Sequence, residues 1–165
     1  MSDSTETGSD IIDGRAAFHR ALTAALDEAA TSGVQHLWLC DPDFADWPLA
    51  QAPVLDALGR WAHSQRRLTL LAADYTVLGT RFARWLAWRR QWSHIVRCLL
   101  VHEEEAPSVP SLLFVPGFTA VRLHDRDRHR GRIHRAATEL APCHQLLDAL
   151  SQRAEESFPV TTLGL

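Results

Sequence analysis

Three short, mostly apolar runs constrain the fold of this chain most, because stretches with helical periodicity separate them. The runs are HLWLC (36–40), LTLLAA (68–73) and IVRCLLV (95–101). Runs of this length and composition are typical of strands buried on both sides, and parallel strands need crossover helices to connect them. The pattern predicts an α/β domain with a mainly parallel sheet flanked by helices.

The intervening segments carry apolar residues at helical spacing. They predict a helix from Ile11 to Ser32 with Gly33 as its C-cap, a second beginning at Pro53, a third over 76–92 and a last over 140–154. Pro116-Gly117 is a turn dipeptide, so 111–123 is predicted as a β-hairpin placed before the last helix.

The polar first ten residues predict a disordered tail over 1–10, followed by one α/β domain over 11–165. Cys40, Cys98 and Cys143 are isolated, which predicts reduced, buried thiols rather than a zinc site. Neither a signal peptide nor an apolar stretch long enough to cross a membrane is recognisable, so we expect a cytoplasmic protein with no membrane contact.

The chain contains 17 arginines and no lysine. The absence of lysine excludes a phosphate-loop lysine, a Schiff base and a Ser-Lys dyad, since arginine stays protonated. A formal net charge of -3 provides no overall attraction to nucleic acid or to an anionic membrane. Any such attraction must come from a local patch.

The order of elements resembles one unit of the phospholipase D-like superfamily, from Ile11 onward. HLWLC, RLTLLAAD and HIVRCLLV match its successive strands, and VPSLLFVPGFTAVRL looks like its motif segment of the form HxKLLLVDG. The resemblance places Val109 at the nucleophilic histidine, Pro110 at the variable position and Ser111 at the lysine, while Pro116 replaces the usual aspartate. Valine and serine can supply neither nucleophilic attack nor the phosphate contact.

The chain also looks like a family of uncharacterised bacterial domains with the same degenerate layout, some of them appended to GNAT-type acetyltransferase domains. The closing SFPVTTLGL is part of that likeness, and no acetyltransferase segment is present. The resemblance implies a non-catalytic binding or interaction module, with no catalytic residue, cofactor or metal. It further implies a homodimer, and a protein or an anionic molecule as ligand.

Two alternatives remain open, and the first is a hydrolase with a carboxylate site. Asp41, Asp43 and Asp74 follow predicted parallel strands, where α/β sheets place their ligand crevice. Such carboxylates can bind magnesium or act as a general base, but Asp residues after strands also serve as turn and helix caps. His102, followed by three glutamates, and Ser111 complete this candidate pocket.

The second alternative is a nucleic-acid or anion contact by RLHDRDRHRGRIHR (122–135), with Arg122, His124, Arg126 and Arg128 as candidate ligands. The interleaved aspartates favour instead a self-paired, solvated loop between the hairpin and the last helix. His124, His129 and His134 recur every five residues, a spacing that suits no single face, so no metal site is predicted.

A third cluster mixes tryptophan with arginine on the predicted helix over 76–92. Trp85 and Trp92 fit the core face of that helix, whereas Trp88 falls off this stripe and is expected to be the exposed one.

Overall fold

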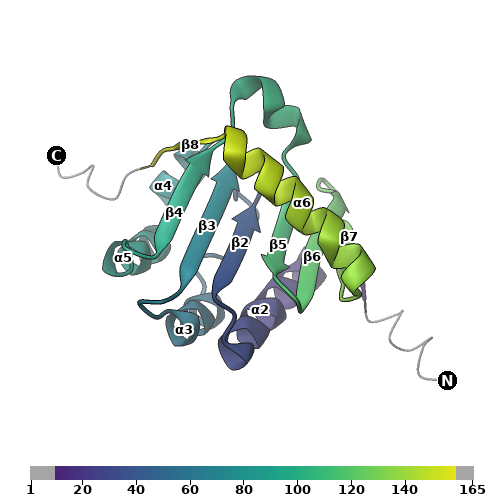
Figure 1. Ribbon diagram of the computed structural model, residues 1–165, viewed down its shortest axis with the longest axis horizontal. Helices are drawn as coiled ribbons and strands as arrows, with labels where there is room; N and C mark the ends of the chain where they lie inside the picture. The colour runs from purple at the N-terminus through teal and green to yellow at the C-terminus, as the bar shows by residue number, and fades with distance from the viewer. Residues whose placement is uncertain (1–9, 159–165) are drawn as a thin grey trace.

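Residues 10–158 are described by the computed structural model, and they form one open eight-stranded sheet with helices on both faces (Figure 1). The strand order is β1-β7-β6-β5-β2-β3-β4-β8. The strands are β1 (Ile11–Asp13), β2 (His36–Cys40), β3 (Arg67–Ala72), β4 (Val96–Leu100), β5 (Ser111–Val115), β6 (Thr119–Asp125), β7 (Arg130–His134) and β8 (Glu155–Glu156).

The α/β class is confirmed, but the expectation of a mainly parallel sheet is wrong. Only β2 with β3 and β3 with β4 pair in parallel, and the other five neighbouring pairs of the described sheet are antiparallel. The reason lies after β4, where short turns connect β5, β6 and β7 and leave no room for crossover helices. Each apolar run does form a strand, so the error concerns direction and not location.

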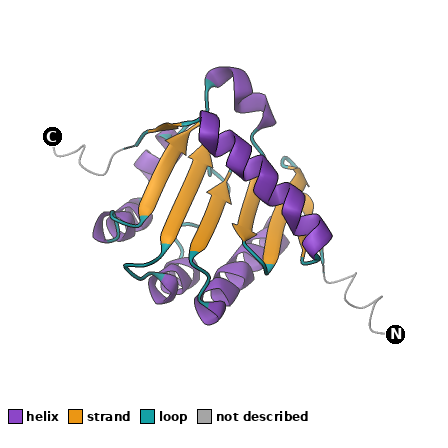
Figure 2. Cartoon of the chain, viewed as in Figure 1, coloured by secondary structure: helices purple, strands orange, loops and turns teal. Residues whose placement is uncertain are grey.

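The helices flank this sheet on two sides (Figure 2). They are α2 (Arg15–Ser32), α3 (Ala52–Trp61), α4 (Thr76–Arg81), α5 (Ala83–Gln91) and α6 (Ala137–Arg153), with a 3-10 helix, η1, over Glu103–Ser108. As predicted, Gly33 ends α2 in the left-handed conformation at φ 72°, and its N–H bonds the carbonyl of Ala29. Pro53 lies in the first turn of α3.

Two predicted helices begin or end elsewhere. Residues from Ile11 form the edge strand β1 instead of helix, because Ile12 is buried and pairs with Gly131 of β7. The helix predicted over 76–92 is broken at Phe82, whose φ and ψ of -111° and 62° are not helical. The predicted tail over 1–10 lies outside the described residues, apart from Asp10.

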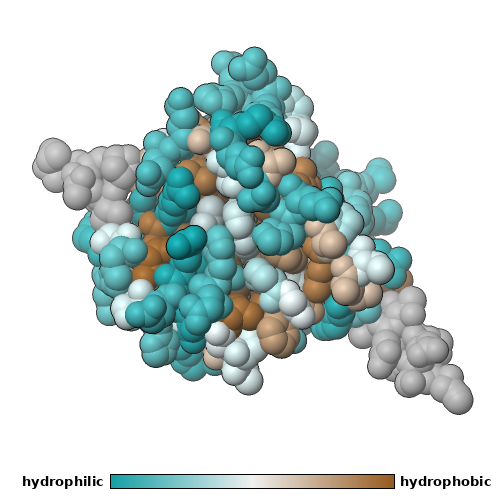
Figure 3. All heavy atoms as spheres, viewed as in Figure 1, coloured by the Kyte–Doolittle hydropathy of each residue, from teal (hydrophilic) through white to brown (hydrophobic). Residues whose placement is uncertain are grey.

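The two faces of the sheet bury different side chains, since neighbouring strand residues point to opposite sides. On the back face, α2, α3 and α5 cover the larger core, which includes Leu37 and Leu39 of β2. On the front face, α6 alone crosses the sheet diagonally over Trp38 and Cys40 of the same strand (Figure 1). The front face is therefore the less covered one, and Figure 3 shows apolar residues between the polar ones on this side.

Candidate functional site

Residues 122–135, predicted as a loop, form the end of β6, a tight turn and all of β7. Gly131 explains the close pairing, because a Cβ at this position would overlap the backbone carbonyl of Arg122. Most charges of the segment are paired, but the expectation of a self-paired loop differs from the structure, because only one of the following ion pairs joins two residues of the segment. The ion pairs join Arg126 to Asp41 and Asp43, Arg128 to Asp125, Arg130 to Asp13, and Arg135 to Asp10.

Arg126 connects this hairpin to the loop after β2. Its guanidinium lies 3.1 Å from Oδ2 of Asp41 and 2.5 Å from Oδ1 of Asp43. Asp41 is 1% exposed, and its Oδ2 also accepts the backbone N–H groups of Asp43 and Phe44. Burial lowers the pKa of Arg126, and the two carboxylates more than offset this and raise it. The carboxylates of Asp41 and Asp43 therefore fix the loop after β2 and attach the β6–β7 hairpin to it.

The loops that follow β2 and β3 do meet, as expected for parallel neighbours: the N–H of Asp74 bonds the carbonyl of Pro42 at 3.1 Å. The carboxylates nevertheless do not gather. The Asp74 side chain is exposed, and hydrogen bonds from the side chain of Thr76 and then from its N–H, at 2.8 Å, lower the pKa of that carboxyl. His102 is exposed beside η1. Within residues 10–158, no group of three or more His, Cys, Asp or Glu side chains has a metal-binding arrangement.

The positions that the resemblance aligned with the phospholipase D-like motif are packed inside the protein. Val109 belongs to the front-face core, and Ser111 is 4% exposed on β5. The Ser111 hydroxyl is buried and makes no hydrogen bond in the described part of the chain. Pro116 lies in the turn between β5 and β6. An incoming phosphodiester would meet neither a charged group nor an accessible nucleophile at Val109 or Ser111.

Four basic side chains share the front face of the β6–β7 hairpin, and we call them the basic strand face: Arg122, His124, Arg132 and His134. Their common orientation follows from the register, which pairs Arg122 with Arg132. The rings of His124 and His134 lie 6.2 Å apart, and Nδ1 of His134 is 3.1 Å from Oε2 of Glu139. Burial, then Arg122, His134 and Arg132, lowers the pKa of His124. Among the described residues, Arg122 and Arg132 form no ion pair.

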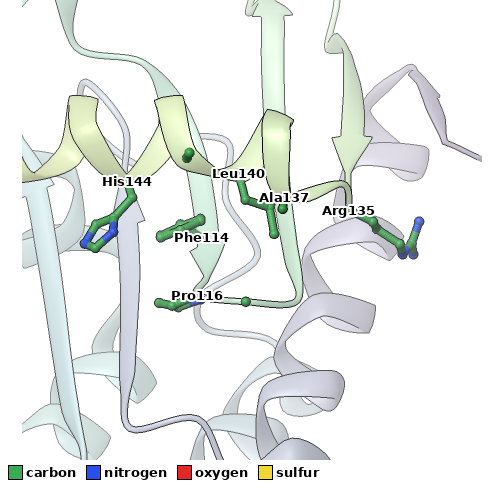
Figure 4. Close-up of a pocket in the computed structure, with 8 residues that line it drawn as sticks. Phe114, Pro116, Arg135, Ala137, Leu140 and His144 are labelled. Atoms are coloured by element: carbon green, nitrogen blue, oxygen red, sulfur yellow. The ribbon is translucent and has the colours of Figure 1, made fainter.

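A mainly apolar groove of about 340 Å³ lies beside α6 (Figure 4). The rings of Phe114 and His144 lie 5.6 Å apart at one end, while Arg135 points away from the groove toward Asp10. The lining residues are Phe114, Pro116, Gly117, Arg135, Ala137, Leu140, Ala141 and His144.

The tryptophan cluster of α5 is core and not a stacking surface. Trp85 is fully buried, and Trp88, expected to be exposed, is only 9% exposed, because residues three positions apart on a helix lie next to each other on one face. Arg89, which was not among the candidates from the sequence, is buried on the same helix at 5% exposure. Arginine is rarely buried without a partner. The signal that could have found Arg89 is its spacing, because it lies four residues after Trp85 on the same helix face, whereas the exposed Arg90 does not.

The described residues therefore define an α/β protein with one open, mixed sheet, and none of their helices has the length and apolar character needed to span a bilayer. The chain is similar in structure to TrmBL2, an archaeal chromatin protein with a novel mode of DNA binding, at a TM-score of 0.61 and 12% identity. The match covers 89% of this chain and 53% of that chain, so this chain spans about half of its neighbour. At this identity the likeness concerns the fold.

No protein-family model matches the chain, and no curated protein is significantly similar to it in sequence.

Proposed function

We propose that the chain is a binding domain of phospholipase D-like layout that does not cleave phosphodiesters. One observation carries this proposal: Val109 and Ser111, at the positions of the histidine and lysine of the motif, are buried in the strand packing. The carboxylate alternative is further weakened, since Asp41 and Asp43 are already bonded to Arg126 and to backbone N–H groups.

The test is hydrolysis of a generic phosphodiester, bis-p-nitrophenyl phosphate, by the purified chain with and without magnesium. We expect turnover at the buffer rate and no magnesium-dependent rise in Tm. Turnover that is abolished in His102→Ala or Asp43→Asn, but retained in the matched surface variant His63→Ala, would refute the proposal. His63 is exposed after α3 and lies outside the candidate pocket.

A second candidate function is a contact with a nucleic-acid backbone by the basic strand face. Two observations favour it: Arg122 and Arg132 have no acidic partner among the described residues, and the structurally similar chromatin protein binds DNA. Arginine can bond phosphate oxygens through its fork of N–H donors. Arg126 is bound to Asp41 and Asp43, and Arg128 lies in the turn outside the basic strand face, 3.9 Å from Asp125, so neither takes part in this proposal.

Binding to duplex DNA measured across a salt series tests this second function. Each phosphate contact contributes a slope of about -0.9 to the dependence of log K on log salt concentration. We expect Arg132→Gln and Arg122→Gln each to reduce the slope by about 1. The control is Arg60→Gln, an exposed arginine on α3 that pairs with Asp27. Absent binding, or equal effects of all three changes, would exclude the basic strand face.

The homodimer implied by the phospholipase D-like resemblance is part of the proposal. Light scattering should give about twice the chain mass of 18.5 kDa. A mass of one chain at micromolar concentration would remove the dimer and leave the binding function to be tested separately.

A further inference from the structure

A second charged site lies on the opposite side of the molecule, where the end of α5 meets the outer edge of β4. A cavity of about 310 Å³ opens there, and Arg89, Arg97, Ser93 and Ser157 contribute to its lining. This volume is at the lower end of the range for small-molecule pockets. The cavity shares no residue with the basic strand face or with the groove beside α6.

Arg89 is the unusual member of this lining. It is 5% exposed, its Nε makes no hydrogen bond, and no carboxylate lies within ion-pair distance in residues 10–158. Removing a guanidinium from water costs several kcal/mol unless a counter-charge compensates, and arginine cannot escape this cost by losing its proton. A buried arginine of this kind indicates a missing anionic partner.

The groups around Arg89 compensate its charge only in part. The ring of Phe158 lies 4.7 Å from the guanidinium carbon, which provides a cation–π contact. The carbonyl end of α5 adds a partial negative charge. Cys98 also lines the cavity but stays a neutral thiol, since burial raises its pKa to about 12.

The remaining charges in the cavity are one arginine and one glutamate. Arg97 lies 4.0 Å from Glu156, and both side chains are more than half exposed, so their attraction is weak. The serine side chains can donate hydrogen bonds. The lining therefore holds one buried guanidinium with an unbonded Nε, an exposed arginine that already lies beside a glutamate, and neutral donors.

We propose that this cavity binds a single oxyanion group, a phosphate or a carboxylate, held by Arg89. Arg89 gives the buried contact, and the hydroxyl groups of Ser93 and Ser157 are the neutral donors of the same lining. The site is independent of the proposed function, because its residues take no part in the basic strand face.

Thermal unfolding of the whole chain in phosphate, acetate or chloride at equal ionic strength tests the proposal. Low millimolar concentrations keep general salt exclusion small. We expect phosphate, acetate or both to raise Tm by about 3 °C at a concentration tenfold above Kd. A response to phosphate identifies a phosphate site, and a response to acetate identifies a carboxylate site. Equal Tm values in the three salts would overturn the proposal.

Variants locate the response. Arg89→Met should weaken binding of the responding anion at least tenfold. Arg90 is the exposed neighbour on the same helix, so Arg90→Met should bind the anion as the wild type does. Ser93→Asp places a carboxylate at the cavity from an exposed position and should also abolish the response, even if Arg89→Met does not fold. Undiminished anion binding in Ser93→Asp, or equal effects of the Arg89 and Arg90 changes, would refute the site.

Discussion

At the scale of single residues, buried polar groups decide where this chain tolerates change. Asp41 is buried, but its carboxylate accepts hydrogen bonds from two backbone N–H groups and from the guanidinium of Arg126. Removing one partner of a buried pair costs more than the pair contributes, because the remaining group keeps its desolvation penalty.

Asp41→Asn should lower the free energy of unfolding by about 1 to 3 kcal/mol. The double variant with Arg126→Met should lose less than the sum of the two single losses, because both changes remove the same contact. Urea unfolding of both single variants and the double variant measures the coupling. Asp43→Asn is the matched comparison and should cost less, since Asp43 is about one-third exposed. Strictly additive losses would show that the Arg126 contact contributes nothing.

His36 makes stability depend on pH. Burial, then the charges of Arg67 and His144, lowers its pKa from 6.5 to about 4. Between these values the unfolded chain takes up a proton that the folded chain does not, so stability falls as the pH drops through this window. The expected loss is about 1 to 2 kcal/mol, given that the ring is partly solvated.

Urea unfolding midpoints from pH 7 to pH 4 should therefore change less in His36→Gln than in the wild type. His19 and His124 also have lowered pKa values and act in the same direction, so the informative quantity is the difference between the two proteins. Parallel pH profiles would contradict the assignment to His36.

At the scale of elements, the sequence located best those helices and strands whose residues carry the signal within the element itself. The apolar runs located β2, β3 and β4, and Gly33 located the end of α2. The β6–β7 hairpin was missed although it carries a signal: Val121, Leu123 and Ile133 alternate with basic residues at the period of a strand. The density of charge obscured this alternation.

The candidate site was harder to predict, because its contacts join distant parts of the chain. Arg126 and Asp41 are 85 positions apart, and nothing local pairs them. The meeting of the Asp43 and Asp74 loops was predictable from parallel strands, whereas the direction of each side chain was not. The side of α5 on which Arg89 lies could be predicted from its spacing to Trp85, whereas its contact with Phe158, distant in the sequence, has no local signal.

Gly131→Ala tests how the hairpin is built. The added methyl group would overlap the β6 backbone, so we expect a loss of about 2 to 4 kcal/mol in the free energy of unfolding. Gly59→Ala is the control, because nothing lies near its Cβ position on α3 and alanine favours helix by about 0.5 to 1 kcal/mol. Chemical denaturation compares them, and a neutral Gly131→Ala would contradict the observed register.

At the scale of the whole molecule, two cores of unequal size lie on either side of the sheet. The front core depends on α6 alone, and Leu147 is its fully buried contact. Cys40 and Cys143 lie in this core, whereas Cys98 lies in the back core. Burial raises the pKa of all three thiols, so each should react slowly while the protein is folded.

Leu147→Ala should lower the free energy of unfolding by about 2 to 4 kcal/mol and loosen α6 from the sheet. Alkylation followed by mass mapping should then modify Cys143 and Cys40 faster than Cys98. Leu58→Ala, at a fully buried position of α3, is the matched change in the back core. In this variant Cys98 should be alkylated faster than Cys40 and Cys143. Equal labelling of the three thiols in both variants would show that the cores open together.

The positions of β1 and β8 fix how this domain would connect its neighbours in a longer assembly. They are the outermost strands on opposite sides, with six strands between them. Seven spacings of about 4.8 Å separate their axes by about 30 Å in a twisted sheet. A partner joined before β1 and a partner joined after β8 would therefore be attached about 30 Å apart. The domain would act as a rigid spacer, so two attached partners would meet only through linkers long enough to reach around it.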